Sequence, residues 1–299
     1  MSDGARIWRA GDKSITLDKP VVVGILNVTP DSFSDGGLSF SVDSAVKRAL
    51  QLLEEGADIV DIGGESTRPG AEPVDAAEEL MRVIPVIDAF RAKAPAAVIS
   101  VDTVKAATAE QALAVGADIV NDVSGHRLDP RMTELCASAR CGVVLMHSRG
   151  PVREMASYEN ATYGEDVMDE VSSELLARVE VARRGGVAES AIVVDPGIGF
   201  SKRSEHSVAV LRGLPRLAAL GYPVMVGVSR KRVLGDLSGV SAAAGRDAAT
   251  AGANVFALIR GAALFRVHDV RSARQSLDTA WRLSESEGGA GVTPRPRRA

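Results

Sequence analysis

Apolar runs recur along the chain at a spacing that is typical of β-strands separated by helices. Each run is rich in Val and Ile and is continuously apolar, which favours a parallel sheet that is covered by helices. Eight such runs can be counted, at residues 21–26, 59–62, 98–101, 119–120, 143–146, 192–194, 224–228 and 264–267. The pattern therefore predicts eight buried parallel strands.

Segments with helical spacing fill several of the intervals between these strands. Apolar positions recur with the period of one helix face in residues 42–55, 76–93, 103–115, 166–184 and 247–260. A doubly wound open sheet would need fewer strands or a second domain in a chain of 299 residues. We therefore predict an α/β fold that consists of a single (β/α)8 barrel, the TIM-barrel architecture.

The two ends of the chain differ from this repeating middle. Residues 7–20 have the pattern of a small β-hairpin, so residues 1–20 are predicted to form an extension ahead of the first barrel strand. Residues 284–299 are rich in Gly, Pro and Arg, which predicts a disordered tail. The barrel itself is expected to span residues 21–283.

Composition argues against nucleic-acid-binding, membrane and disulfide-rich proteins. Hydrophobic residues make up 45% of the chain and aromatic residues only 4%, which indicates an aliphatic core. A net charge of −4 gives no reason to expect binding to nucleic acid. No apolar stretch reaches membrane-spanning length, and the N-terminus lacks the pattern of a signal peptide. We therefore expect a cytoplasmic protein that does not bind membranes, in which Cys136 and Cys141 are buried thiols rather than a disulfide framework.

Polar residues end the predicted strands. They are Asn27, Asp61, Asp102, Asn121 with Asp122, His147, Asp195, Ser229 with Arg230, and Arg266 with His268. In a parallel barrel the carboxyl ends of all strands lie on one face, and active sites of this architecture occupy that face. Stability alone does not explain polar groups at every strand end. The pattern therefore predicts an active site there.

The motifs at these strand ends resemble those of a known enzyme family. They occur in the order GILNVTPDSFSDGG, DIGGESTRPGA, SVDT, NDVSG, LMH, DPGIGF, GVSRKR and RVHDV. Together they resemble the dihydropteroate synthase family, pterin-binding TIM-barrel enzymes of folate biosynthesis. Each motif alone is weakly specific, but the whole ordered set is highly specific.

The resemblance implies a transferase that joins dihydropterin-methyl diphosphate to 4-aminobenzoate. Dihydropteroate and diphosphate would be its products. The carbon–oxygen bond is expected to break ahead of carbon–nitrogen bond formation, in an SN1-like reaction. The residues that we expect to be catalytic are Arg266, His268 and Lys231, with Mg²⁺ assisting the departure of diphosphate.

A pterin has an amide-like edge with adjacent N–H donors, which a buried carboxylate can bind through two charge-assisted hydrogen bonds. By the resemblance, Asp195 is this carboxylate, and Asp102 and Asn121 complete the polar contacts to the ring. The further pterin-binding residues that the family implies are Lys231, Met146, Phe200 and Arg266. Taken alone, Asp102 or Asn121 is equally well explained as a helix cap, because both precede predicted helices.

The diphosphate group needs positive charge. Arg266 and His268 lie two residues apart in an extended segment, so their side chains are expected to point the same way. The resemblance implies that they clamp the diphosphate together with Thr67, and that Asn27 contacts it as a ligand of Mg²⁺. Magnesium commonly takes one or two protein oxygens while phosphates and waters complete its shell, so an acidic cage is not required.

Two glycine-bearing segments, residues 28–39 and 63–72, follow the first two strands and carry polar residues. They are predicted to be mobile lids over the barrel mouth. In the family these loops build the aminobenzoate pocket, which is also the target of sulfonamides. The residues implied in this pocket and in loop closure are Phe33, Thr67, Arg68, Pro69 and Asp35.

The carboxylate of 4-aminobenzoate needs a cation or a helix N-terminus. Ser229 is predicted to cap the helix that follows the seventh strand, which would leave free N–H groups there. Arg232 adds positive charge at a position where many family members have Ser. The sequence leaves open whether the side chain or the backbone of Arg232 holds the carboxylate.

Two other functions share part of this pattern. A corrinoid-linked methyltetrahydrofolate methyltransferase has a similar pterin-binding Asp/Asn/Asp set but no use for a diphosphate clamp. A catalytically silent paralogue would bind pterin, or only a partner, without turnover. Alanine-rich helical segments at residues 248–260 and 272–283 are where the family leads us to expect a homodimer.

Overall fold

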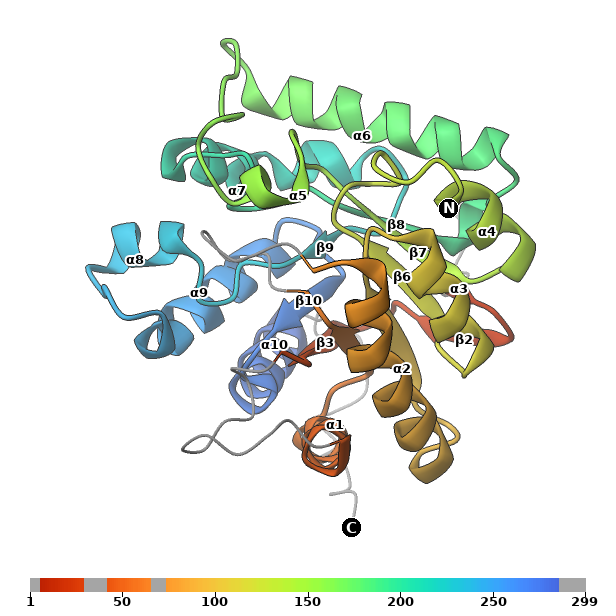
Figure 1. The fold of residues 1–299 in the computed structure, drawn as a ribbon. Coiled ribbons are helices and arrows are strands. Elements are labelled where there is room, and N and C mark those ends of the chain that lie inside the picture. Colours follow the sequence, from red (N-terminus) through yellow and green to blue (C-terminus); the bar gives the residue numbers. More distant parts are fainter. Residues whose placement is uncertain (1–5, 30–41, 66–73, 285–299) are drawn as a thin grey trace.

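A computed structural model describes residues 6–29, 42–65 and 74–284 of the chain. Within these residues the eight predicted strands form one parallel sheet in the order β8-β7-β6-β5-β4-β3-β10-β9. A parallel bridge between Val194 and Val224 joins the two ends of this sheet, so the sheet closes on itself. Figure 1 shows the strands at the centre with helices around them, which confirms the predicted TIM barrel.

The strands begin within one residue of the apolar runs, and several extend further, into the polar residues. They are β3 (Val21–Asn27), β4 (Ile59–Gly63), β5 (Val98–Asp102), β6 (Ile119–Asp122), β7 (Gly142–Met146), β8 (Ile192–Asp195), β9 (Met225–Val226) and β10 (Leu264–Val267). Most of the polar strand-end residues are therefore held by the hydrogen-bonded ladder itself. Only β9 is much shorter than predicted.

The helices cover the outer face of the sheet. They are α1 (Val42–Glu55), α2 (Ala76–Lys93), α3 (Ala106–Ala114), α4 (Met132–Ala139), α5 (Val152–Met155), α6 (Val167–Arg184), α7 (Ser204–Ala218), α8 (Arg232–Ser238), α9 (Asp247–Leu258) and α10 (Val270–Ser284), with short 3-10 turns at Glu189–Ala191 and Ala243–Arg246. Aspartates begin two of them as N-caps, since Asp75 accepts from the Glu78 N–H and Asp166 from the Met168 and Asp169 N–H groups.

Two helices are shorter than their apolar spacing predicts. Helix α3 begins at Ala106 rather than at Thr103, because Thr103 accepts from the Lys105 N–H at 3.1 Å and donates to Glu79 at 3.1 Å. Helix α9 ends at Leu258, before the predicted Arg260, at a turn in which Gly261 has a φ of +95°. In both cases the local polar or glycine geometry outweighs the apolar spacing.

Alternate strand positions point into the barrel, and they form two layers of different chemistry. The layer nearer the strand starts is apolar and contains Val23, Ile59, Ile119, Val144, Val193 and Leu264. Residues two positions later on five of these strands share the same inward direction. They are Asp61, Asn121, Met146, Asp195 and Arg266. A mainly polar layer therefore lies directly above an apolar floor, on rigid strands.

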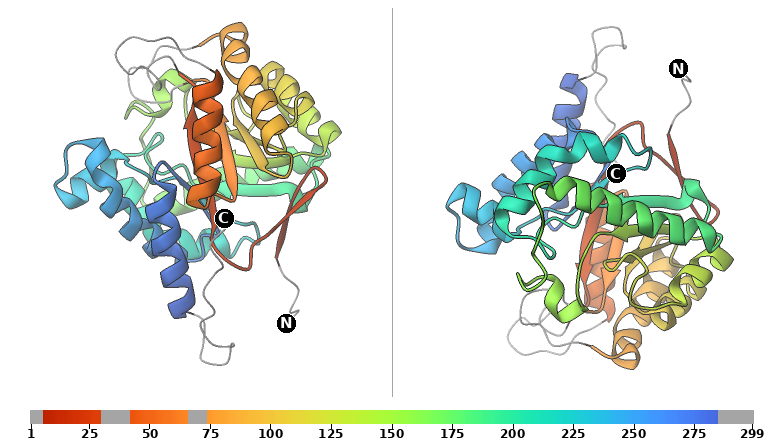
Figure 2. Two further views of the ribbon diagram at one scale, coloured as in Figure 1. Left: turned by 90° about the horizontal axis from the view of Figure 1, so that it is seen from below. Right: turned by 90° about the horizontal axis from the view of Figure 1, so that it is seen from above.

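The predicted N-terminal hairpin is present and covers the end of the barrel where the strands begin (Figure 2). It consists of β1 (Ile7–Ala10) and β2 (Lys13–Thr16), which pair antiparallel. Trp8 packs against the apolar inner layer and is only 1% exposed. Its indole Nε1–H donates to the Ala191 carbonyl at 2.7 Å. The hairpin thus closes the barrel floor with a large aromatic side chain.

We expect Trp8→Ala to lower the free energy of unfolding by about 3 to 5 kcal/mol, because it removes a fully buried ring and leaves a cavity. Ile7 lies next to Trp8 on the same strand but is 42% exposed, so Ile7→Ala is the matched control. The control should change stability by no more than about 0.5 kcal/mol. Urea denaturation of both variants measures the difference. Equal stability losses in the two would contradict this account of the hairpin.

Among the described residues, none of the helices combines the length and the apolar character that crossing a bilayer requires. Both cysteines are buried and free, as predicted. The expectations for Phe33, Asp35, Thr67, Arg68 and Pro69, and for residues 285–299, lie outside the described residues. Ser284, the first residue assigned to the tail, is the last residue of α10.

Candidate active site

A cavity of about 700 Å³ opens at the carboxyl ends of the barrel strands. Its lining brings together eight of the residues that the sequence predicts as site residues: Asn27, Asp102, Phe200, Ser229, Lys231, Arg232, Arg266 and His268. These residues come from five different strands or the segments that follow them. The predicted Asn121, Met146 and Asp195 belong to the buried layer next to this lining.

Arg266 is the charged centre of the site. Its Nε donates to Asp61 Oδ2 at 2.6 Å, and its Nη2 donates to Asp102 Oδ2 at 2.6 Å. Asn121 donates through Nδ2 to the same Asp61 oxygen at 3.1 Å. Asp61 is fully buried, and its Oδ1 has no hydrogen-bond partner among the described residues. One guanidinium thus binds two carboxylates, and these two carboxylates still have oxygen lone pairs that can accept hydrogen bonds from a ligand.

Burial and crowding change the pKa values of these groups. Desolvation raises the pKa of Asp102 to about 7, and the neighbouring Asp61 carboxylate adds to this while Arg266 opposes it. Burial alone would lower the pKa of Arg266, but the carboxylates of Asp61 and Asp102 outweigh it and raise the pKa. Arg266 therefore stays charged, whereas Asp102 changes its protonation near neutral pH.

Asp195 and Lys231 meet above Gly227, where Arg266 is also a neighbour. Asp195 Oδ1 accepts from the Gly197 N–H at 2.7 Å. A Cβ on Gly227 would lie 3.8 Å from Asp195 Oδ2 and 3.9 Å from Lys231 Nζ, so both groups face the open space that this glycine leaves. The second carboxylate oxygen of Asp195 is therefore directed into the site.

Lys231 also touches an apolar wall. Its Nζ donates to the Ile198 carbonyl and lies 4.3 Å from the centre of the Phe200 ring. Burial lowers the pKa of Lys231 to about 8, although the Asp195 carboxylate opposes this. Phe200 packs against a small buried cluster that contains Met146 and Met155. The predicted apolar contacts, Met146 and Phe200, are therefore neighbours.

His268 is held by Ser229. The Ser229 hydroxyl lies 2.9 Å from His268 Nδ1, and its oxygen accepts from the His268 N–H at 3.2 Å. The prediction that Ser229 caps the following helix is wrong. Helix α8 has Lys231 as its N-cap, without a capping side chain, because a turn closed by the Lys231 N–H and the Val228 carbonyl separates Ser229 from the helix.

Arg232 lies at the exposed mouth of the cavity. Its Cζ is 4.8 Å from the centre of the Tyr158 ring, on which Arg203 also stacks at 5.2 Å. Asn27 ends β3 and contributes its side chain to the cavity lining from a half-buried position. In the part of the chain that the structure describes, no group of three or more His, Cys, Asp or Glu side chains could hold a metal.

Asp61 and Tyr158 are among the site residues that were missing from the prediction. Asp61 was identified as a strand-end residue but received no role, although it binds both Arg266 and Asn121. Its position two residues after the inward Ile59 would have placed it in the same layer as the other polar residues. Tyr158 has no comparable signal, because it lies in an irregular segment after α5.

The chain matches known proteins over most of its length. A family model described as "Pterin binding enzyme" matches residues 23–268. A dihydropteroate synthase of Mycobacterium leprae (strain TN) is 46% identical over 267 residues, which cover 87% of this chain and 93% of the relative. The solved structure of Xanthomonas albilineans dihydropteroate synthase with 4-aminobenzoic acid has a TM-score of 0.87 and 43% identity, and the match covers 95% of this chain and 99% of that one.

A plant relative is considerably longer. The mitochondrial folate synthesis bifunctional protein of Arabidopsis thaliana is 42% identical over 298 residues, which cover 95% of this chain but only 54% of the relative. The chain therefore spans about half the length of this bifunctional relative and nearly all of the single-function ones.

Proposed function

The chain belongs to the pterin-binding enzyme family, and on this premise we propose that it joins dihydropterin-methyl diphosphate to 4-aminobenzoate. The products are dihydropteroate and diphosphate. The observation that carries this proposal is the convergence of Asp102, Arg266, His268 and Lys231 on one cavity at the barrel mouth. The relatives named dihydropteroate synthase, which match nearly end to end, support the same reaction.

The buried polar layer supplies a matching surface for the pterin. Asp195 offers one free carboxylate oxygen beside Lys231, and Asp102 lines the same cavity. Carboxylates accept the ring N–H donors, while the Lys231 ammonium donates to the ring carbonyl. Asn121 both donates and accepts, and Phe200 with Met146 packs against the ring. This combination recognises a planar, amide-edged heterocycle.

The diphosphate is placed against Arg266 and His268, with Asn27 at the end of the neighbouring strand. Ser229 fixes the His268 imidazole, so that its other nitrogen is directed away from Ser229. The amide oxygen of Asn27 suits Mg²⁺, which would take its remaining ligands from phosphate and water. When bound, Mg²⁺ would supply charge neutralisation of the leaving diphosphate.

The reaction breaks a carbon–oxygen bond and an N–H bond and forms a carbon–nitrogen bond, and the proton that is released passes to water. The carbon–oxygen bond of the pterin methylene breaks and its electron pair leaves with diphosphate. The aniline nitrogen then bonds to the methylene carbon and releases one proton. Arg266 and His268 stabilise the charge that develops on the departing oxygen, and the carboxylates around the ring stabilise its positive charge. The 4-aminobenzoate carboxylate is placed near Arg232 at the mouth.

Product formation tests this function directly. The protein is incubated with dihydropterin-methyl diphosphate, 4-aminobenzoate and Mg²⁺, and dihydropteroate is followed by chromatography, with a chelator as control. Mg²⁺-dependent product supports the proposal. Pterin binding without product would identify the silent paralogue, and methyl transfer from methyltetrahydrofolate to a corrinoid protein would identify the methyltransferase.

Asp102 predicts a pH dependence for pterin binding. Its pKa is raised to about 7 by burial, so it is mostly ionised at pH 8 and mostly protonated at pH 6. A protonated carboxyl has lost an acceptor, and we expect the Kd for hydroxymethyl-dihydropterin, which lacks the titrating diphosphate, to rise about tenfold over that interval. Calorimetry measures this Kd. Asp102→Asn should abolish the rise in Kd toward pH 6 and leave only a weaker, opposite trend near pH 8, where Lys231 loses its proton. A rise toward pH 6 that is unchanged in this variant would contradict the assignment.

Sulfonamides are expected to compete with 4-aminobenzoate. They resemble its ring and its anionic end, and so would occupy the space between Lys231 and Arg232 at the cavity mouth. Initial rates measured against both compounds should show inhibition that excess 4-aminobenzoate relieves. Full turnover at limiting 4-aminobenzoate and saturating sulfonamide would contradict this prediction.

Two properties of the whole protein belong to the same proposal. We propose a homodimer through α9 and α10, which pack together and leave Ile259 67% and Leu283 82% exposed. We also propose a cytoplasmic location. Light scattering of the purified protein tests the dimer.

A further inference from the structure

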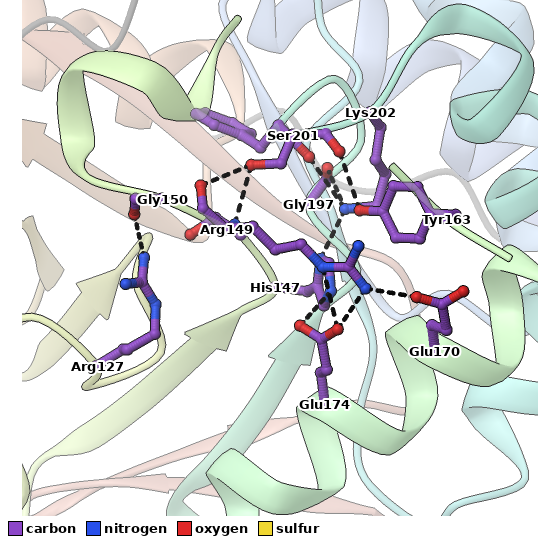
Figure 3. A network of polar contacts seen from close by, with 12 residues as sticks. Arg127, His147, Arg149, Gly150, Tyr163, Glu170, Glu174, Gly197, Ser201 and Lys202 are labelled. Carbon is purple, nitrogen blue, oxygen red and sulfur yellow. Dashed lines mark hydrogen bonds and ion pairs between the residues drawn. The ribbon is translucent and has the colours of Figure 1, made fainter. Parts of the chain in front are cut away.

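One deeply buried cation beside the cavity has no role in the function proposed above. Lys202 is 1% exposed, although it also contributes to the cavity lining. Its Nζ lies 2.8 Å from His147 Nδ1, and it donates to the Gly197 and Phe200 carbonyls at 3.1 Å each. Figure 3 shows Lys202 between His147 and the turn that carries Gly197. Burying a lysine is costly unless its donors are satisfied, so this arrangement needs a reason.

The neighbouring groups define the protonation state of this cluster. His147 Nε2 faces Glu174 Oε2 at 3.2 Å without the geometry of a hydrogen bond, and the His147 ring beside this carboxylate lowers the pKa of Glu174 to about 2. Burial lowers the pKa of His147 to about 4, so its ring carries one proton at neutral pH. That proton belongs on Nε2, which faces the carboxylate, and Nδ1 is then an acceptor. Burial lowers the pKa of Lys202 well below its ordinary value, and the nearby Asp195 carboxylate opposes this. The three partners of Nζ, all within 3.1 Å, match the three donors of the ammonium form.

The three acceptors belong to segments that shape the pterin site. The Gly197 N–H donates to Asp195 Oδ1 at 2.7 Å, and the His147 N–H donates to the Asp195 carbonyl at 2.8 Å. The turn at Gly197 is packed so closely that a Cβ there would lie 2.0 Å from the His147 carbonyl oxygen. Phe200, whose carbonyl is the third acceptor, carries the ring beneath Lys231. One ammonium thus joins the end of β7 to the whole 195–200 turn.

The cluster is anchored on the outer side of the barrel. Glu174 belongs to α6 and also accepts from Arg149 Nε at 3.0 Å. Arg149 in turn donates to Glu170 at 2.7 Å, on the same helix (Figure 3). Lys202 therefore contacts an imidazole that itself lies against a fixed carboxylate. This makes Lys202 a rigid attachment point rather than a mobile side chain.

We propose that Lys202 is a positioning residue for the reaction: its ammonium holds the 195–200 turn so that the Asp195 carboxylate and the Phe200 ring meet the pterin. This inference rests on the proposed function, because it assumes that the pterin binds against Asp195. Loss of the ammonium would leave two carbonyls and an imidazole nitrogen without donors, and the turn would relax. The affinity for pterin should therefore fall, whereas the binding of 4-aminobenzoate at the cavity mouth should not change.

The test compares Lys202→Met with the matched control Lys13→Met. Lys13 also binds a carbonyl, of Ala97, and lies 2.9 Å from Asp118, but it belongs to the hairpin at the opposite end of the barrel. We expect Lys202→Met to weaken hydroxymethyl-dihydropterin binding by about 10- to 100-fold, as loss of a buried charged hydrogen-bond donor commonly does. Its KM for 4-aminobenzoate should change by less than about threefold. The control should affect melting temperature only.

Chemical rescue separates positioning from stability. In Lys202→Ala, n-propylammonium can fill the vacated space and restore three donors, so pterin affinity should recover in its presence. If Lys202→Met is obtained only unfolded, Lys202→Gln, which keeps two donors, is measured by the same assays and should show intermediate affinity. The proposal is overturned if a folded Lys202 variant binds pterin as the wild type does. It is also overturned if pterin and 4-aminobenzoate parameters worsen equally, as a purely structural role requires.

The wild-type chain distinguishes failure of this inference from failure of the proposed function. Wild-type protein that binds pterin but forms no dihydropteroate would refute the proposed reaction, while the Lys202 affinity series would still decide the positioning role. Wild-type protein that binds no pterin overturns both.

Discussion

Replacing Arg266 by alanine is expected to lower kcat/KM by about 10³-fold or more. The guanidinium is the strongest positive charge at the place where diphosphate leaves, and an interaction of that kind commonly contributes about 10²- to 10³-fold in rate by itself. The substitution also leaves Asp61 and Asp102 facing each other without the cation that each binds at 2.6 Å. Their repulsion would disturb the pterin pocket, which adds to the loss. Steady-state kinetics with both substrates measures the effect.

Destabilisation must be separated from catalysis in this variant. Removing one partner of a buried ion pair typically costs about 3 to 5 kcal/mol of stability. Arg266→Ala combined with Asp61→Asn should therefore regain stability without regaining activity. Arg274 is a matched control, since it too binds two carboxylates, those of Asp58 and Asp278, from a largely buried position, but it lies on α10 outside the barrel. Arg274→Met should lose stability and keep its kcat/KM. Arg266→Ala with more than a tenth of wild-type kcat/KM would contradict the assigned role.

The barrel was predictable because its signals are local. Val and Ile runs that end in polar residues specify parallel strands, and eight of them fit only one common architecture. The alternation of side chains along a strand also predicts which polar residues point into the barrel, and the position at a strand end alone does not. Asn121 and Asp122 are an example. Asn121 shares the inward direction of Ile119 and joins the site, whereas Asp122 points outward and accepts from the Ser124 and His126 N–H groups. Applied to Ile59, the same rule would have identified Asp61 as a site residue.

Other features depend on contacts between distant segments and could not be predicted. Thr103 is kept out of α3 by the buried Glu79, which comes from a different helix. Ser229 binds His268 from the neighbouring strand instead of capping α8, because the two strand ends are brought together only by the closed barrel. Lys202 and His147 meet for the same reason. Periodicity and spacing describe one segment at a time, so partners of this kind become visible only in the folded chain.

Asp195→Asn is expected to weaken pterin binding by about 10²- to 10³-fold, or about 3 to 4 kcal/mol. Asp195 Oδ1 accepts from the Gly197 N–H, so the amide oxygen of Asn would take that position. Its NH₂ group would then face the Lys231 ammonium and the pterin N–H groups. Two hydrogen-bond donors would then face each other at a site with little water. This arrangement weakens binding by more than the loss of one hydrogen bond would. Calorimetry with hydroxymethyl-dihydropterin measures the affinity.

Asp122→Asn is the control that matches this change in chemistry, in burial and in position at a strand end. Asp122 is fully buried like Asp195, but its carboxylate binds backbone N–H groups on the outer side of β6. The control variant should therefore lose stability and bind pterin with wild-type affinity. If both substitutions weaken pterin binding equally, the effect comes from the barrel as a whole, and Asp195 is not the carboxylate that recognises the ring. If only Asp195→Asn weakens pterin binding, the free Asp195 oxygen above Gly227 is the one that binds the N–H groups of the pterin edge.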